Sequence, residues 1–157
     1  MSLGRAVVIG YGNPLRADDG AATELVESLY RLHPDAADWR INMQLLPELA
    51  EDLQKYDRAI FVDCSVELPP GKVNCKAVER RTETDTAFTH HLDPATLLGL
   101  THTLFAKSPQ GFLVSIGGED FAAREGLSPT VKASLSEAER LILDILTKGE
   151  VACTSTR

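Results

Sequence analysis

Residues 5–14 of the sequence read RAVVIGYGNP, an apolar run followed at once by turn-forming residues. A short apolar run bounded by Gly, Asn and Pro is typical of a buried β-strand that ends in a tight loop. Apolar residues then recur at helical spacing from Ala21 to Leu29, after Asp18 and Asp19 and before Pro34. The chain is therefore predicted to begin as strand, loop and helix.

The same alternation continues along the chain and is the pattern of α/β folds. We expect further strands at 40–46, 58–62, 72–78 and 111–116, and helices at 47–54, 94–105 and 129–146. The turn at 69–71 is too short for a parallel crossover, so the strand at 72–78 is expected to be antiparallel. The predicted fold is a three-layer α/β/α sandwich with a mixed, mostly parallel twisted sheet of about five strands.

Size and composition limit the function classes. With 157 residues, 43% of them hydrophobic, the chain is predicted to form a single domain over residues 1–157. The net charge of −7 argues against nucleic acid as a partner, because phosphate binding needs clustered Lys and Arg. No run is long enough for a membrane span and no export signal is visible. Three cysteines without a CxxC pair are expected of a cytoplasmic protein.

Carboxylates follow two of the predicted strands. Asp18 and Asp19 follow the first strand and Asp63 ends the third, so they are expected at the same edge of the sheet. With a histidine from the pair His90 and His91, they would suit nickel or zinc. Each also has a simpler explanation: Asp18 or Asp19 caps the first helix, Asp63 forms a turn, and the histidines are an exposed loop pair.

Other catalytic motifs are incomplete. Gly10 and Gly12 begin a dinucleotide-like pattern, but Leu15 stands where the third glycine belongs and acidic residues follow. Neither a P-loop nor the G-x-S-x-G serine-hydrolase motif is present. Cys64, next to Asp63, is a weak candidate nucleophile because it continues a buried strand without an identified base.

A more specific signal comes from residues 8–21, VIGYGNPLRADDGA. This run resembles the signature of the hydrogenase maturation endopeptidases, G-x-G-N-x-L-x-x-D-[DE]-x-x-G/A. Later segments follow in the family's order and extend the resemblance over essentially the whole chain: LLPEL at 45–49, AIFVD at 59–63, THHLDP at 89–94, GE at 118–119 and GLSP at 126–129.

The resemblance implies an endopeptidase of the hydrolase class that removes the C-terminal peptide of a nickel-dependent hydrogenase large-subunit precursor after nickel insertion. By position, Asp19, Asp63 and His90 would be both the metal ligands and the catalytic residues, with His91 as the alternative histidine. Nickel would be carried by the substrate and serve as the recognition element. Two alternatives remain: a non-catalytic nickel-sensing or chaperone module for hydrogenase assembly, and a small-molecule hydrolase on the same fold.

Overall fold

A five-stranded sheet forms the centre of the molecule. The computed structural model describes residues 3–81 and 92–150. The strands lie in the order β2-β1-β3-β5-β4, and only β4 runs antiparallel to its neighbour. Their bounds are β1 Ala6–Tyr11, β2 Asp38–Asn42, β3 Arg58–Ser65, β4 Val73–Val78 and β5 Gln110–Gly117. The predicted mixed, mostly parallel sheet and the antiparallel strand after the 69–71 turn are confirmed.

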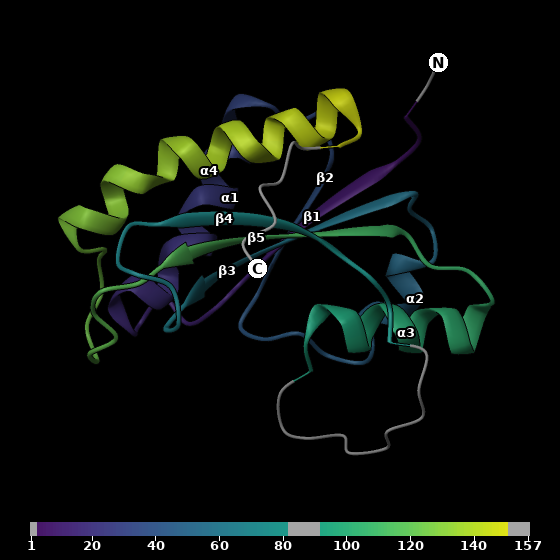
Figure 1. Cartoon of the computed structure of the whole chain (residues 1–157), viewed down its shortest axis with the longest axis horizontal. Coiled ribbons are helices and arrows are strands. Elements are labelled where there is room, and N and C mark those ends of the chain that lie inside the picture. Colours follow the sequence, from purple (N-terminus) through teal and green to yellow (C-terminus); the bar gives the residue numbers. More distant parts are fainter. Residues whose placement is uncertain (1–2, 82–91, 151–157) are drawn as a thin grey trace.

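Helices cover both faces of this sheet (Figure 1). Helices α1 (Ala21–Leu32) and α4 (Pro129–Lys148) pack on one face, and α2 (Leu49–Leu53) and α3 (Pro94–Phe105) on the other. Each face has its own apolar core, which is why β1 and β3 are apolar at successive positions rather than at alternate ones. The three-layer α/β/α architecture predicted from the sequence is confirmed.

Two helices begin with the local signals that the sequence contains. The Asp93 side chain accepts a hydrogen bond from the Thr96 amide at 2.8 Å, and Pro94 follows as the first helical residue of α3. Ser128 caps α4 in the same way through the Val131 amide at 3.3 Å. A side-chain acceptor followed by Pro satisfies an orphan amide and fixes φ for the first turn. These caps define the residue at which each helix begins.

Two predicted strand bounds are wrong. The second strand is β2, Asp38–Asn42, because residues 43–46 leave the sheet instead of pairing with β1. The third strand does not end at Asp63 but continues to Ser65, where it still pairs with β5. The residues before and after Asp63 both pair with β5, so Asp63 lies within the strand and is not a turn residue.

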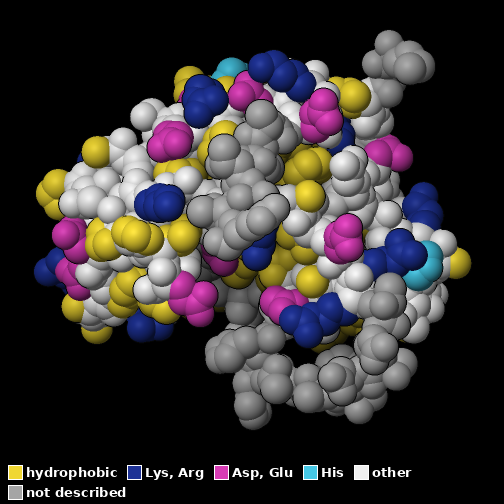
Figure 2. All heavy atoms as spheres, viewed as in Figure 1, with side chains coloured by type: hydrophobic (Ala, Val, Ile, Leu, Met, Phe, Trp, Pro, Cys, Tyr) yellow, Lys and Arg dark blue, Asp and Glu magenta, His cyan; other side chains and the backbone are white. Residues whose placement is uncertain are grey.

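The surface mixes both signs of charge. On the face drawn in Figure 2, Lys and Arg side chains are scattered among Asp and Glu and do not gather into one basic area. Within residues 3–81 and 92–150, no helix is both long and apolar enough to cross a membrane.

Candidate functional site

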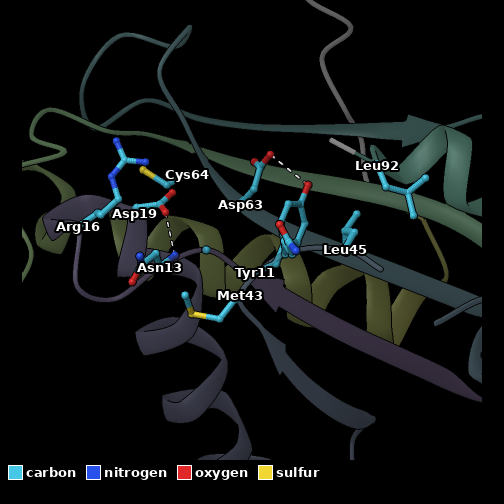
Figure 3. Close-up of a pocket in the computed structure, with 11 residues that line it drawn as sticks. Tyr11, Asn13, Arg16, Asp19, Met43, Leu45, Asp63, Cys64 and Leu92 are labelled. Atoms are coloured by element: carbon cyan, nitrogen blue, oxygen red, sulfur yellow. Dashed lines mark hydrogen bonds between the residues drawn. The ribbon is translucent and has the colours of Figure 1, made fainter. Parts of the chain in front are cut away.

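A cleft of about 540 Å³ opens at the carboxyl edge of the parallel strands. Its walls come from the end of β1, the loop that follows it, the 3-10 helix η1 (Ala17–Gly20), the segment after β2 and the end of β3. Both Asp19 and Asp63 line it, as the strand pattern predicts, and Figure 3 shows Asp19 beside Asn13 and Cys64, and Asp63 beside Tyr11. Ligand sites in open α/β sheets are expected at this edge.

Asp63 lies on β3 and is held by two hydroxyl groups. Ser115 Oγ, from the directly adjacent position on β5, donates to Oδ1 at 2.6 Å, and the Tyr11 hydroxyl donates to Oδ2 at 3.2 Å. Burial raises the pKa of the Asp63 carboxyl, and the charge of Asp19 adds to this, while both hydrogen bonds act in the opposite direction. Asp63 is thus a fixed carboxylate that holds a proton more readily than an exposed aspartate does.

Tyr11 is the last residue of β1 and reaches across the end of the sheet to Asp63 (Figure 3). Burial, followed by the neighbouring charge of Asp63, raises the pKa of its phenol. The hydroxyl therefore remains protonated at neutral pH and acts as a hydrogen-bond donor to the carboxylate.

Asp19 reaches the cleft from η1. Its Oδ2 accepts a hydrogen bond from the Asn13 amide at 2.7 Å, so the carboxylate is tied to the loop after β1. The simpler explanation, that Asp18 or Asp19 caps the first helix, is wrong. Neither η1 nor α1 has a side-chain cap, and the residue before α1 is Gly20.

Gly12 permits the loop to approach η1 closely. Its φ is +148°, and an added Cβ would lie 2.2 Å from the backbone carbonyl oxygen of Asp19. Its amide also donates to the Asn42 carbonyl at the end of β2, at 3.1 Å. Only glycine gives the loop this path between β2 and the acidic turn.

Replacing this glycine is expected to destabilise the protein. Gly12→Ala should lower the free energy of unfolding by roughly 1–3 kcal/mol, because φ is strained and the new methyl group meets backbone. Gly126→Ala is the matched control, since Gly126 also has positive φ (+100°) but nothing within 4 Å of an added Cβ. Urea unfolding of both variants measures the difference; equal losses would mean that the close approach to Asp19 has no cost.

Asp18 has a different role from its neighbour. It is fully buried, and its carboxylate accepts four hydrogen bonds from residues 101–110 positions later in the chain. The donors are the amides of Glu119, Asp120 and Ser128 and the hydroxyl of Ser128, at 2.7–2.9 Å. Asp18 therefore ties η1 to the loop after β5 and to the beginning of α4, and its buried carboxylate does not line the cleft.

Cys64 also lines the cleft, beside Asp19 and Arg16 in Figure 3. Burial, together with the charges of Asp18, Asp19 and Asp63, raises the pKa of its thiol to about 12. The nucleophilic form of cysteine is the thiolate, so this environment disfavours Cys64 as an attacking group.

The remaining candidates divide into two groups. His90 and His91 lie outside the described residues, although Leu92, next in sequence, lines the cleft. Among the described residues, no three His, Cys, Asp or Glu side chains lie close enough together to hold a metal ion. His33 follows the end of α1 and His102 lies within α3, and neither lines the cleft.

Three residues of the site were missed in the sequence: Tyr11, Asn13 and Ser115. For Ser115 a signal was present, since it is the one polar side chain in the apolar run 112–116 and pairs directly with Asp63. Asn13 contributes its backbone amide, which has no residue-specific signal.

Comparison with known proteins identifies structural relatives. No family model matches the sequence, and no curated protein matches it. Among solved structures, the chain is similar to the hydrogenase maturating endopeptidase HybD from E. coli, with 26% identity, a TM-score of 0.72, and coverage of 92% of this chain and 93% of that one. A hydrogenase 2 maturation peptidase from a Thaumarchaeota archaeon follows at 25% identity and a TM-score of 0.68, with 91% and 98% covered. A hydrogenase maturation protease from Thermococcus kodakarensis shares the fold at 22% identity and a TM-score of 0.69, with 90% and 92% covered.

The fold and the acidic cleft, together with these relatives, define the class of protein: a hydrolase that cleaves peptide bonds. Within that class the chain groups with the hydrogenase maturation endopeptidases, and the family predicted from its N-terminal motif is confirmed.

Proposed function

We propose that this protein removes the C-terminal peptide of a nickel-containing hydrogenase large-subunit precursor after nickel insertion, and that it acts in the cytoplasm. The observation that carries the proposal is the meeting of Asp19 and Asp63, from separate elements, in one cleft of a chain with this family's fold. Two carboxylates at the same edge present hard oxygen ligands to a divalent cation.

The cleft also suits a segment of polypeptide. Its volume of about 540 Å³ is in the range of ligand-binding clefts. Part of the cleft wall beside the carboxylates is apolar and consists of Met43, Leu45 and Leu92. A peptide would lie along this apolar part, and a cation would bind at the carboxylates. This division is what a substrate that carries its own metal would require.

In the proposed reaction, nickel is part of the substrate. Asp19, Asp63 and His90, or His91 in its place, would hold it, and the position of Leu92 in the cleft wall supports drawing the third ligand from this pair. A metal held there would polarise the scissile carbonyl or lower the pKa of an attacking water. The water oxygen bonds to the carbonyl carbon, the C–N bond breaks, and the leaving amine takes up a proton. That proton comes from the attacking water, and a carboxylate of the site such as Asp63 would pass it to the amine.

The test is the intact mass of a purified large-subunit precursor before and after incubation with this protein. Loss of one short C-terminal peptide from the nickel-loaded precursor, and not from the nickel-free control, is the expected result. An unchanged mass with a folded, loaded precursor would contradict peptidase activity, and would leave a chaperone module that binds without cleaving.

Asp19→Asn is expected to slow this cleavage by at least about 100-fold, because an amide cannot replace the charge that a cation needs. The fold should tolerate the change, since Asp19 Oδ2 accepts only one hydrogen bond and the amide oxygen can accept it as well. The mass assay measures the rate, and Asp35→Asn, at an exposed position outside the cleft, is the control. Cleavage by Asp19→Asn at the wild-type rate would remove Asp19 from the proposed site.

A further inference from the structure

The carboxylates of Asp19 and Asp63 each have one oxygen fixed by a short hydrogen bond, but they differ in the contacts of the second oxygen. Asp19 has one oxygen fixed by the Asn13 amide at 2.7 Å, while its Oδ1 has no hydrogen bond to any described residue. Asp63 has Oδ1 fixed by Ser115 at 2.6 Å, but its Oδ2 is covered by the Tyr11 hydroxyl at 3.2 Å. Asp63 can offer both lone pairs of Oδ2 to a ligand only if Tyr11 gives up this contact.

The two hydrogen bonds to Asp63 differ in strength. The Ser115 contact falls in the short range of charge-assisted O–H···O⁻ bonds, whereas the Tyr11 contact is longer than O–H···O bonds usually are. The stronger hydrogen bond comes from the donor that is more firmly held by its strand. Ser115 is 8% exposed and lies within β5, whereas Tyr11 is the last residue of β1 and forms part of the cleft wall. Ser115 is thus the more firmly placed of the two, and Tyr11, which lines the cleft, makes the weaker contact with Asp63.

We infer that Tyr11 is a movable cover over Asp63, whose hydroxyl gives way when a divalent cation binds between Asp19 and Asp63, while Ser115 remains as the fixed anchor. Both are positioning residues, because each acts on the cation through the Asp63 carboxylate. The inference deepens the proposed function and rests on it only for the origin of the cation, which is there carried by the substrate.

Opposite effects of two single substitutions follow from this arrangement. In Tyr11→Phe the cation no longer displaces a hydrogen bond from Oδ2, so its affinity should rise about five-fold. In Ser115→Ala the carboxylate loses the contact that orients it, so affinity should fall about ten-fold. A purely supporting role for Tyr11 would instead lower affinity in both variants.

The probe is Zn²⁺, which accepts the same carboxylate and imidazole ligands as nickel and is diamagnetic. Isothermal titration of the isolated full-length protein gives the affinities of wild type, Tyr11→Phe and Ser115→Ala. Tyr30→Phe and Ser136→Ala, at exposed positions on α1 and α4, are matched controls expected to leave affinity unchanged. Thermal melting of every variant verifies that it is folded.

A second measurement follows the hydroxyl itself. With tyrosine labelled at ¹³Cζ, the Tyr11 signal is assigned from its loss in Tyr11→Phe. It should shift on addition of Zn²⁺, while the signals of Tyr30 and Tyr56 stay in place. Zinc binding with a stationary Tyr11 signal, weaker binding in Tyr11→Phe, or no zinc binding at all would each overturn the inference. These measurements contain no precursor. A zinc-induced shift of the Tyr11 signal, together with opposite changes of zinc affinity in Tyr11→Phe and Ser115→Ala, would therefore support the inference even if the precursor were never cleaved.

Discussion

Asp63→Asn is expected to reduce cleavage of the nickel-loaded precursor by at least about 100-fold, the lower end of what a positioned acid–base group contributes. The asparagine amide cannot hold a proton for the leaving amine and offers a cation one neutral oxygen. It would also turn an N–H₂ group toward either Ser115 or Tyr11, both of which donate to the carboxylate. The rate is measured by the loss of the C-terminal peptide from the precursor.

The same substitution should leave stability unchanged or improve it. Burial raises the pKa of the Asp63 carboxyl above its value in the unfolded chain, so near neutral pH the charged form destabilises the fold. A neutral amide removes that cost, and the Ser115 or Tyr11 hydroxyl that meets its N–H₂ group can rotate to accept a hydrogen bond, unlike the backbone amides around Asp18. The melting temperature is therefore expected to equal or exceed that of wild type. Wild-type cleavage by Asp63→Asn would exclude this carboxylate from the reaction, and a much lower melting temperature would make any loss of activity uninformative.

Asp18→Asn should have the opposite pattern, with a loss of roughly 3–5 kcal/mol in the free energy of unfolding. The side chain is fully buried and accepts four hydrogen bonds, and an amide group presents N–H where an acceptor is needed. Urea unfolding measures the loss. Asp19→Asn is the matched control from the adjacent position, with a single hydrogen bond to maintain and an expected loss of about 1 kcal/mol. Equal losses in the two variants would contradict the assignment of Asp18 as the structural residue of the pair.

The parts of the fold predicted from the sequence are those whose signals are local. The apolar runs gave β1, β3 and β5, and the Asp93-Pro94 and Ser128-Pro129 pairs gave the starts of α3 and α4. The strand expected at 40–46 ends at Asn42, because Met43 and Leu45 lie in the cleft wall and not in the sheet. Leu45 is buried there, whereas Met43 is 60% exposed. An apolar run alone predicts neither the strand pairing nor the burial of each of its residues.

The site was predicted less completely, because its contacts are long-range. Spacing alone could not distinguish Asp18 from Asp19, since the donors that bind Asp18 come from residues 119–128. The resemblance to the maturation endopeptidases assigned Asp19, and the structure places it in the cleft with Asp63. The choice between His90 and His91 stays a prediction, as both lie outside the described residues.

The hydrogen bonds of Asp18 also set an order of assembly. They join the first of the two acidic residues to backbone made more than 100 residues later, so they cannot form while the chain is still short. On a ribosome, the turn that carries Asp19 would lack its support until the beginning of α4 had emerged. A nascent or truncated chain without residues 119–128 would therefore lack the donors that order the turn carrying Asp19, and the acidic pair would be complete only after those residues had been made.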